Sequence, residues 1–357
     1  MKKNIAVVRG DGIGTEIVEE ALKILKALAK LYKHDFSFSE VLAGGCAIDK
    51  TGLCLPDESL KACKDSDAVL LGAVGGPKWD KEKSTNRPEQ AILKLRKELN
   101  LFANMRPAFL FDILKEASPL KPEILEKGID LLILRELTGG VYFGEHKTQS
   151  IDNELVASDD MSYKQSEIER IAKLGFEIAR TRKKRLCSVD KANVLDTSRL
   201  WRKVLDEMAK KYPDVELEHM YVDNAAMQLC ARPSHFDVLL TENMFGDILS
   251  DEASVITGSI GLIPSASINE SSKGLYEPIH GSAPDIAGQN KANPIATILS
   301  VAMMLKLSFK LEKEAKAIED AVQETLKQGF RTADIMSKDC TLLTCSQMGD
   351  EIVKNLS

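Results

Sequence analysis

The sequence predicts an α/β protein with two interleaved domains. Three observations support this prediction. Short apolar runs alternate with amphipathic helical patterns, as in proteins built on a largely parallel sheet. A chain of 357 residues is long enough for about two domains. No repeat, low-complexity stretch or linker separates the halves, so we expect the domains to share the chain rather than to follow one another.

The expected elements follow in order along the chain. Residues 5–8 form a short apolar run that predicts a buried strand, and apolar residues at helical spacing predict a helix over 17–31. The other expected strands are 68–71, 130–134, 186–189, 217–222 and 238–241. The other expected helices are 88–99, 166–180, 294–310 and 313–328. Ligands of open α/β sheets collect beyond the carboxyl ends of strands, so site residues are sought there.

Composition and charge exclude several classes of protein. The chain is 44% hydrophobic and 29% charged, which is typical of globular proteins. Its net charge of −6 argues against a nucleic-acid partner. The seven cysteines are odd in number and never spaced as CxxC, which favours a reducing cytoplasm over a disulfide framework. The apolar runs at 5–8 and 295–305 are too short for a secretory signal or a membrane span, so neither is expected.

Three aspartates are candidate metal ligands. Asp247 and Asp251 lie four residues apart and share one face if their segment is helical. Asp223 follows an expected strand. Short carboxylates suit a hard octahedral cation, Mg²⁺ or Mn²⁺. The alternative is that Asp247 caps a helix and Asp251 is solvated. No HExxH pair occurs among the histidines, so a hydrolytic zinc site is not supported.

Three arginines are candidate substrate ligands. Arg96 lies on an expected helix, Arg106 precedes Pro107, and Arg135 ends an expected strand. A guanidinium binds a carboxylate through two parallel hydrogen bonds, so three converging arginines would suit a dicarboxylate or tricarboxylate. Taken alone, Arg96 also fits the solvated face of a charged helix.

Two further residues are candidate proton carriers. Tyr142 lies in the glycine-rich segment 139–144, where the backbone approaches a ligand closely, and its hydroxyl is a candidate proton donor. Lys191 follows the strand 186–189, and a lysine desolvated near other cations has a lowered pKa suited to a general base. The alternatives are a packed aromatic ring and a surface ammonium.

The glycine loops do not match a Rossmann fingerprint. Segment 10–14 follows the first strand, but its third glycine comes two positions after the second, so GxGxxG is absent. A second loop, 280–288, is rich in small residues. Its Asp285 is suited to accept hydrogen bonds from a pair of ribose hydroxyls and would repel a 2′-phosphate.

Seven segments in one order resemble the β-decarboxylating dehydrogenases of the isocitrate/isopropylmalate type. They are GDGIG at 10–14, RPEQ at 87–90, LFANMRP at 101–107, RELTGGVYFG at 135–144, DKAN at 190–193, DN at 223–224 and NMFGD at 243–247. The resemblance runs from residue 5 to about 335. It implies a two-domain α/β fold of the isopropylmalate dehydrogenase type, with a large mixed sheet and a non-Rossmann cofactor site. The implied domains are a discontinuous cofactor-binding domain (1–101 and 259–357) and a central domain with the dimer interface (102–258).

The resemblance also implies the roles of the candidate residues in a homodimer whose active sites are shared between subunits. Lys191, acting through water, would help to deprotonate a 2-hydroxyl, and Tyr142 would protonate the enolate left after loss of CO₂. Lys191 and Asp223 would come from the partner chain. The implied ligands of the malate carboxylates are Arg96, Arg106 and Arg135. The implied ligands of Mg²⁺ or Mn²⁺ are Asp223, Asp247 and Asp251.

Substrate and cofactor choice follow from the same resemblance. Glu89, Ile92 and Leu93 would face the substrate, where an apolar wall suits an isopropyl group better than a third carboxylate. The expected reaction is NAD-dependent oxidative decarboxylation of 3-isopropylmalate in leucine biosynthesis. The alternatives are D-malate, tartrate or homoisocitrate as substrate, and, in another class, a non-catalytic RNA-binding subunit. The implied NAD-binding residues are Ile13, Gly76, Glu89, Asn193, Glu277, His280, Gly281, Ser282, Ala283, Pro284, Asp285, Ile286 and Asn293.

Overall fold

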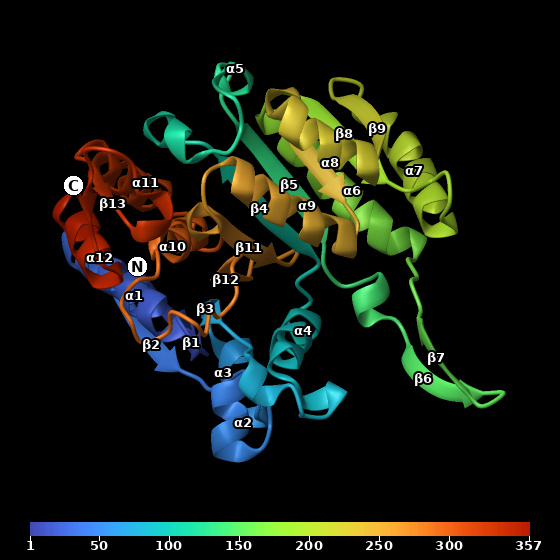
Figure 1. Ribbon diagram of the computed structural model, residues 1–357, viewed down its shortest axis with the longest axis horizontal. Coiled ribbons are helices and arrows are strands. Elements are labelled where there is room, and N and C mark those ends of the chain that lie inside the picture. The colour runs from blue at the N-terminus through green and yellow to red at the C-terminus, as the bar shows by residue number, and fades with distance from the viewer. The chain divides into compact units, whose positions relative to one another are not determined.

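The computed structural model describes all residues, 1–357, and the chain divides into two compact units (Figure 1). Unit 1 comprises Met1–Leu101, Phe111–Pro119 and Thr257–Ser357. Unit 2 comprises Phe102–Leu110 and Leu120–Ile256. Strands of both directions alternate with helices in each unit, so the predicted mixed α/β class is confirmed.

The strands of unit 1 lie in the order β2-β1-β3-β12-β11. All neighbouring strands are parallel except β11 and β12. The core of β1 and all of β3 are buried, as expected of central strands in a parallel sheet covered on both faces. The strand bounds are β1 Lys2–Gly10, β2 Asp35–Glu40, β3 Ala68–Ala73, β11 Pro264–Ile268 and β12 Gly274–Pro278.

Helix α10 (Ile295–Leu307) is the central helix of unit 1 and packs against α1, α11, β11 and β12. It ends earlier than the predicted 310, because Lys310 adopts a left-handed φ of 57° that a helix cannot accommodate. The other helices of unit 1 are α1 Gly14–Tyr32, α2 Gly45–Thr51, α3 Asp57–Asp65, α4 Pro88–Glu98, α11 Glu312–Lys327 and α12 Cys345–Lys354. A small two-stranded sheet pairs β13 (Phe330–Arg331) with β14 (Thr341–Leu342).

The main strands of unit 2 lie in the order β4-β5-β10-β8-β9, with β4 and β5 antiparallel and the other neighbours parallel. The predicted strand 217–222 ends one residue early, because Val222 already begins α8. The strand bounds are β4 Ala103–Phe109, β5 Asp130–Glu136, β8 Arg185–Asp190, β9 Glu216–Tyr221 and β10 Val238–Thr241. The helices are α5 Pro122–Leu125, α6 Gln165–Thr181, α7 Asp196–Ala209, α8 Val222–Ala231 and α9 Asn243–Ile256.

A separate antiparallel hairpin in unit 2 was not predicted. It pairs β6 (His146–Ile151) with β7 (Glu154–Asp159) through a turn in which Asp152 and Asn153 both have positive φ, as a two-residue type I′ turn requires. Every residue of both strands is exposed. Such an isolated hairpin is marginally stable in water without a covering surface.

No helix combines the length and the apolar character needed to cross a bilayer.

Candidate functional site

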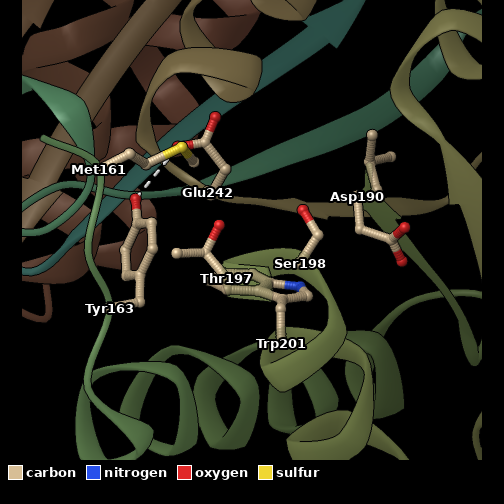
Figure 2. Close-up of a pocket in the computed structure, with 8 residues that line it drawn as sticks. Met161, Tyr163, Asp190, Thr197, Ser198, Trp201 and Glu242 are labelled. Carbon is tan, nitrogen blue, oxygen red and sulfur yellow. Dashed lines mark hydrogen bonds between the residues drawn. The ribbon is translucent and has the colours of Figure 1, made fainter. Parts of the chain in front are cut away.

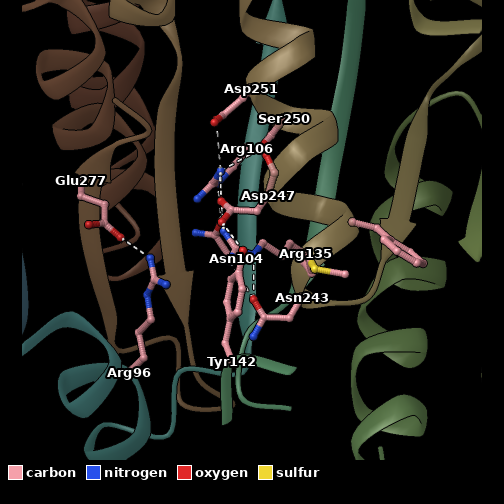
Figure 3. A network of polar contacts seen from close by, with 12 residues as sticks. Arg96, Asn104, Arg106, Arg135, Tyr142, Asn243, Asp247, Ser250, Asp251 and Glu277 are labelled. Carbon is pink, nitrogen blue, oxygen red and sulfur yellow. Dashed lines mark hydrogen bonds and ion pairs between the residues drawn. The ribbon is translucent and has the colours of Figure 1, made fainter. Parts of the chain in front are cut away.

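The structure brings five predicted site residues of unit 2 into one polar network (Figure 3). Asp247 is its centre. Its Oδ1 accepts hydrogen bonds from Nη1 of Arg135 and, at 3.2 Å, from Nη1 of Arg106. Its Oδ2 accepts a bond from the hydroxyl of Tyr142 at 3.0 Å. Nη1 of Arg106 also lies 3.9 Å from Oδ1 of Asp251. The network therefore combines two cations, two carboxylates and a phenol.

Helix α9 places both carboxylates on one face, as predicted. Asp247 lies inside the helix, one turn after its start, so the alternative in which it caps the helix is wrong. Gly246 allows the helix to lie close to β5, because a Cβ at this position would be 2.7 Å from Cγ of Arg135. The Arg135 side chain is 1% exposed, whereas that of Asp251 is 59% exposed. The guanidiniums therefore form the floor of the network, and Asp251 lies nearer to solvent.

Arg106 on β4 is held by neutral partners on both sides. Its Nε donates to Oδ1 of Asn104 at 2.7 Å, and Nη1 donates to Oγ of Ser250 at 2.6 Å. Because each partner fixes a different edge of the planar guanidinium, its orientation is set before any ligand arrives.

Tyr142 lies in the short 3₁₀ turn Val141–Phe143, and its phenol keeps its proton at neutral pH. Burial and the nearby charge of Asp247 raise the pKa of the Tyr142 hydroxyl. A protonated phenol in hydrogen-bond contact with a carboxylate is suited to deliver a proton.

A second layer of buried polar groups lies under this network, and sequence reasoning missed it. Oδ1 of Asn243 accepts bonds from Nε and Nη2 of Arg135 at 3.0 and 2.7 Å. Its Nδ2 donates to the carbonyl of Gly139 at 3.0 Å, and its backbone N–H donates to the hydroxyl of Tyr163 at 2.9 Å. The Tyr163 hydroxyl in turn donates to Glu242 at 3.2 Å (Figure 2).

Lys191 and Asp223 form a separate ion pair in unit 2, at 2.5 Å between Nζ and Oδ1. The hydrogen bond from Lys191 holds the pKa of Asp223 below its usual value. No group of three or more His, Cys, Asp or Glu side chains in the single chain is arranged to hold a metal ion. Asp223 therefore does not join Asp247 and Asp251 within one copy of the chain.

In unit 1, Arg96 on α4 is buried, so the solvated-face alternative for this residue is wrong. Its Nη2 donates to Oε1 of Glu277 at 2.9 Å, and both side chains are less than a tenth exposed. Its Nε is buried without a hydrogen-bond partner. On the same helix Ile92 and Leu93 are half-buried, and Glu89 is exposed. The charge of Arg96 is therefore paired with Glu277, and its Nε is a buried donor whose hydrogen bond is not made within the chain.

Asp11, which was not predicted as a site residue, joins the predicted glycine loop 10–14 to two other segments of unit 1. This carboxylate is 4% exposed. It accepts backbone N–H bonds from Gly45, Cys46 and Gly75 at 2.8, 2.7 and 2.9 Å, with no cation beside it. Burial raises the pKa of Asp11. The only signal in the sequence was its place between two glycines.

The loop at Ser282 is fastened to the same assembly. Its carbonyl accepts a bond from the N–H of Ile13 at 2.8 Å, and its hydroxyl donates to the carbonyl of Gly75 at 2.8 Å. Gly12 has a φ of +55°, and a Cβ there would lie 2.0 Å from the Ser282 carbonyl oxygen. Only glycine fits this approach.

Four further predicted cofactor residues differ in whether contacts within the chain already occupy them. The ring of His280 has a buried Nε2 with no partner, and burial lowers its pKa, which keeps the imidazole neutral. A Cβ on Gly281 would meet nothing within 4 Å. Asp285 is exposed. By contrast, the amide of Asn293 is already used, because it bonds to Asp334 and to the first N–H of α10.

The chain matches the family model described as isocitrate/isopropylmalate dehydrogenase over residues 4–352. It is 65% identical over 356 residues to the 3-isopropylmalate dehydrogenase of Helicobacter hepaticus, and the match covers 100% of each chain. It is 56% identical over 358 residues to that of Aquifex aeolicus, covering 100% of this chain and 98% of the relative. Among solved structures, isocitrate dehydrogenase from Methylococcus capsulatus superposes with a TM-score of 0.87 at 34% identity, covering 99% of each chain.

Proposed function

The chain belongs to the isocitrate/isopropylmalate dehydrogenase family, and from this premise we propose that it oxidises and decarboxylates 3-isopropylmalate, yielding 4-methyl-2-oxopentanoate and CO₂, with NAD as hydride acceptor. The observation that carries the proposal is the network in which Arg106, Arg135 and Tyr142 meet at Asp247. Relatives named 3-isopropylmalate dehydrogenase match along the whole chain. The reaction is a step of leucine biosynthesis.

The arginines supply the binding of the two substrate carboxylates. Arg106 and Arg135 are buried and already oriented by their neighbours, so little conformational entropy is lost when a carboxylate binds. Arg96 is assigned to the same substrate by its motif position and by its free Nε. Ile92 and Leu93 offer an isopropyl group an apolar surface, where a third carboxylate would remain unpaired.

The proton transfers are assigned to Lys191 and Tyr142. When bound, NAD would supply the acceptor for the hydride of C2, and a divalent ion would supply polarisation of the substrate oxygen. Lys191, acting through water, takes the proton of the 2-hydroxyl. Tyr142 gives its proton to C3 of the enolate, whose electron pair comes from the broken bond to the lost carboxylate. One proton is removed and one is added, so the overall reaction neither releases nor consumes a proton.

The donor sets fit these groups. Asp247 and Asp251 are hard oxygen ligands one helical turn apart, and the exposed Asp223 of a second copy would complete the set. The unpartnered Nε2 of His280 and the open space at Gly281 suit a bound NAD. Either Mg²⁺ or Mn²⁺ matches this chemistry.

Exposed apolar groups support a homodimer with shared active sites. Met227 on α8 and Ile248 and Val255 on α9 are 59%, 58% and 57% exposed, and the two helices pack together. Leu155 on the bare hairpin β6–β7 is 82% exposed. Apolar surface of this extent is typical of an interface, and a second copy is the partner that would supply Lys191 and Asp223. The compartment assigned to this dimer is the cytoplasm, which agrees with its seven free cysteines.

Steady-state kinetics test the proposed reaction. The purified protein with Mg²⁺ is given 3-isopropylmalate, D-malate, tartrate, isocitrate or homoisocitrate, each with NAD and with NADP. We expect the largest kcat/KM for 3-isopropylmalate with NAD, by about tenfold or more, because one branched apolar group is worth about 1–3 kcal/mol in such a pocket. A larger kcat/KM for any other substrate would overturn the assignment.

Mixing two impaired variants tests the shared site. We expect Lys191→Ala alone to be inactive and Tyr142→Phe alone to turn over about 10²-fold more slowly than the wild type. If every site takes Tyr142 from one copy and Lys191 from the other, half of the dimers formed after mixing and subunit exchange are mixed, and one of their two sites is intact. The mixture then recovers about a quarter of wild-type activity. Sites contained in single chains would recover none.

A further inference from the structure

We propose that Asn243 is a positioning residue that uses the two ends of one side-chain amide for two tasks, orienting the guanidinium of Arg135 and holding the loop that carries Tyr142. The inference deepens the proposed function and rests on it for the kinetic part of its test.

The oxygen of the amide fixes Arg135. It accepts bonds from Nε and Nη2 at 3.0 and 2.7 Å, so it occupies one full edge of the guanidinium. Arg135 is 1% exposed, and Asn243 is buried beside it. With Nη1 directed to Asp247, the plane of the guanidinium is defined by two partners that lie on the same helix, α9. A carboxylate ligand therefore meets an already oriented group.

The nitrogen of the amide holds the loop. It donates at 3.0 Å to the carbonyl of Gly139, three residues before Tyr142. The preceding strand anchors the same loop, because the carboxylate of Glu136 accepts bonds from the N–H groups of Thr138 and Gly139. Gly140 has a φ of +73°, and a Cβ there would lie 2.5 Å from the Tyr163 hydroxyl, so the loop fits closely on its support.

The backbone of Asn243 is itself fixed. Its N–H donates to the hydroxyl of Tyr163 at 2.9 Å, and that hydroxyl donates to the buried carboxylate of Glu242. The ring of Tyr163 packs edge-on against Trp201, with 5.8 Å between the ring centroids. The amide therefore cannot shift along the helix to relieve a poor contact. Its position determines where Arg135 and the carbonyl of Gly139 are held.

Only an asparagine suits both partners at this position. Arg135 presents donors alone, and the Gly139 carbonyl is an acceptor alone, so the side chain must accept on one end and donate on the other. An aspartate would still bind Arg135 but would place an oxygen against the carbonyl of Gly139. An alanine would lose both contacts. These two substitutions therefore separate the two tasks.

The kinetic test compares Asn243→Asp and Asn243→Ala, with Asn355→Asp as the control. Asn355 also bridges partners with both ends of its amide, but near the C-terminus of unit 1, away from the predicted site residues. In Asn243→Asp we expect the KM for 3-isopropylmalate to stay within about threefold, because the bonds to Arg135 remain, while formation of 4-methyl-2-oxopentanoate falls about tenfold behind NADH formation in single turnovers. In Asn243→Ala we expect the KM for 3-isopropylmalate to rise about tenfold and formation of 4-methyl-2-oxopentanoate to slow about tenfold.

A direct readout does not need activity. The Nε–H signal of Arg135 in ¹H–¹⁵N spectra, assigned by its loss in Arg135→Lys, is expected to be protected from exchange in the wild type and in Asn243→Asp, and unprotected in Asn243→Ala. Thermal unfolding checks that each variant is folded, and Asn243→Asp carries the test if Asn243→Ala is not.

The outcomes separate the two proposals. Unchanged protection of the Arg135 signal in folded Asn243→Ala overturns the positioning role, as does an Asn243→Asp variant that raises KM without separating formation of 4-methyl-2-oxopentanoate from NADH formation. A wild type with the expected signals but no turnover of 3-isopropylmalate overturns the proposed function and leaves the orientation of Arg135 supported.

Discussion

Asp11 in unit 1 and Asp247 in unit 2 are two carboxylates that the protein satisfies in opposite ways. Asp11 is almost fully buried and accepts only backbone N–H groups, from three separate segments. Asp247 is partly exposed and is bound by side chains, two guanidiniums and a phenol. Backbone partners cannot leave unless their loops move, whereas side-chain partners can be exchanged for a ligand. We infer that Asp247, whose partners are side chains, serves the proposed chemistry, and that Asp11, whose partners are backbone groups, holds its loops in place.

Among the variants that test this difference between the two aspartates, we expect the largest effect on activity from Asp247→Asn. The amide keeps one oxygen for Arg135, so we expect the free energy of unfolding to fall by only about 1 kcal/mol. Loss of the proposed metal ligand is expected to remove several kcal/mol of transition-state stabilisation, so kcat/KM for 3-isopropylmalate falls by about 10³-fold. Urea unfolding and steady-state kinetics on one preparation measure both. Strong destabilisation with mild loss of activity would reverse the roles of the two aspartates.

The converse variant is Asp11→Ala. It leaves three buried N–H groups without an acceptor, at about 1 kcal/mol each, so the free energy of unfolding falls by about 3 kcal/mol. We expect the KM for NAD to rise while kcat at saturating NAD stays within about threefold. Asp11→Asn keeps one acceptor oxygen and is the graded control, with a smaller loss. An Asp11→Ala protein of wild-type stability would contradict the structural role.

A third test probes the phenol that Asp247 holds. Tyr142→Phe removes one hydroxyl that is half-buried, so we expect a stability change of about 1 kcal/mol or less. Because the proposed proton donor is lost, formation of 4-methyl-2-oxopentanoate in single turnovers is expected to slow by about 10²-fold, while NADH formation and substrate binding change little. If NADH formation slowed equally, Tyr142 would act before decarboxylation, and its assignment would be wrong.

The smallest effect is expected in the pH dependence of stability. Burial raises the pKa of Asp11 above its ordinary value of 3.8, so the folded protein binds this proton more tightly than the unfolded chain. Its contribution to stability therefore falls as the pH rises from 3.8 to the raised pKa, and is constant above it. The pKa of Asp223 is lowered by Lys191, so its contribution is present above 3.8 and is lost as the pH falls through the lowered pKa.

Urea titrations at pH values on both sides of this window measure the difference between the wild type and each Asn variant. We expect Asp11→Asn to lose most stability relative to the wild type at the acid end of the window, and Asp223→Asn to lose least there. Parallel curves for the two variants would contradict the directions of the two pKa shifts.

The local sequence pattern was sufficient to predict structure where the burial or the face of a residue depends on its own segment. The apolar runs at 5–8 and 238–241 are fully buried strands, as predicted, because central parallel strands are covered on both faces. The spacing of Asp247 and Asp251 also fixed their common face, because a helix brings residues four apart together.

The rest depended on partners far along the chain. Asp11 accepts bonds from N–H groups 34, 35 and 64 residues away, and every residue except proline carries such a group, so no pattern marks them. Arg96 looked like one more cation on a charged helix, because its partner Glu277 is 181 residues distant. The hairpin 146–159 has no buried face, so its sequence shows no clear apolar alternation.

That bare hairpin has a consequence for how any assay of the protein is run. A segment that gains burial only from a second molecule couples its order to protein concentration through mass action. In the proposed dimer, dilution of the protein to a concentration near the dissociation constant would loosen the hairpin. The same dilution would leave about half of the chains without a complete active site. Specific activity would then decline with dilution even though no residue has changed, and a protease that cuts near Asn153 would report the same equilibrium independently.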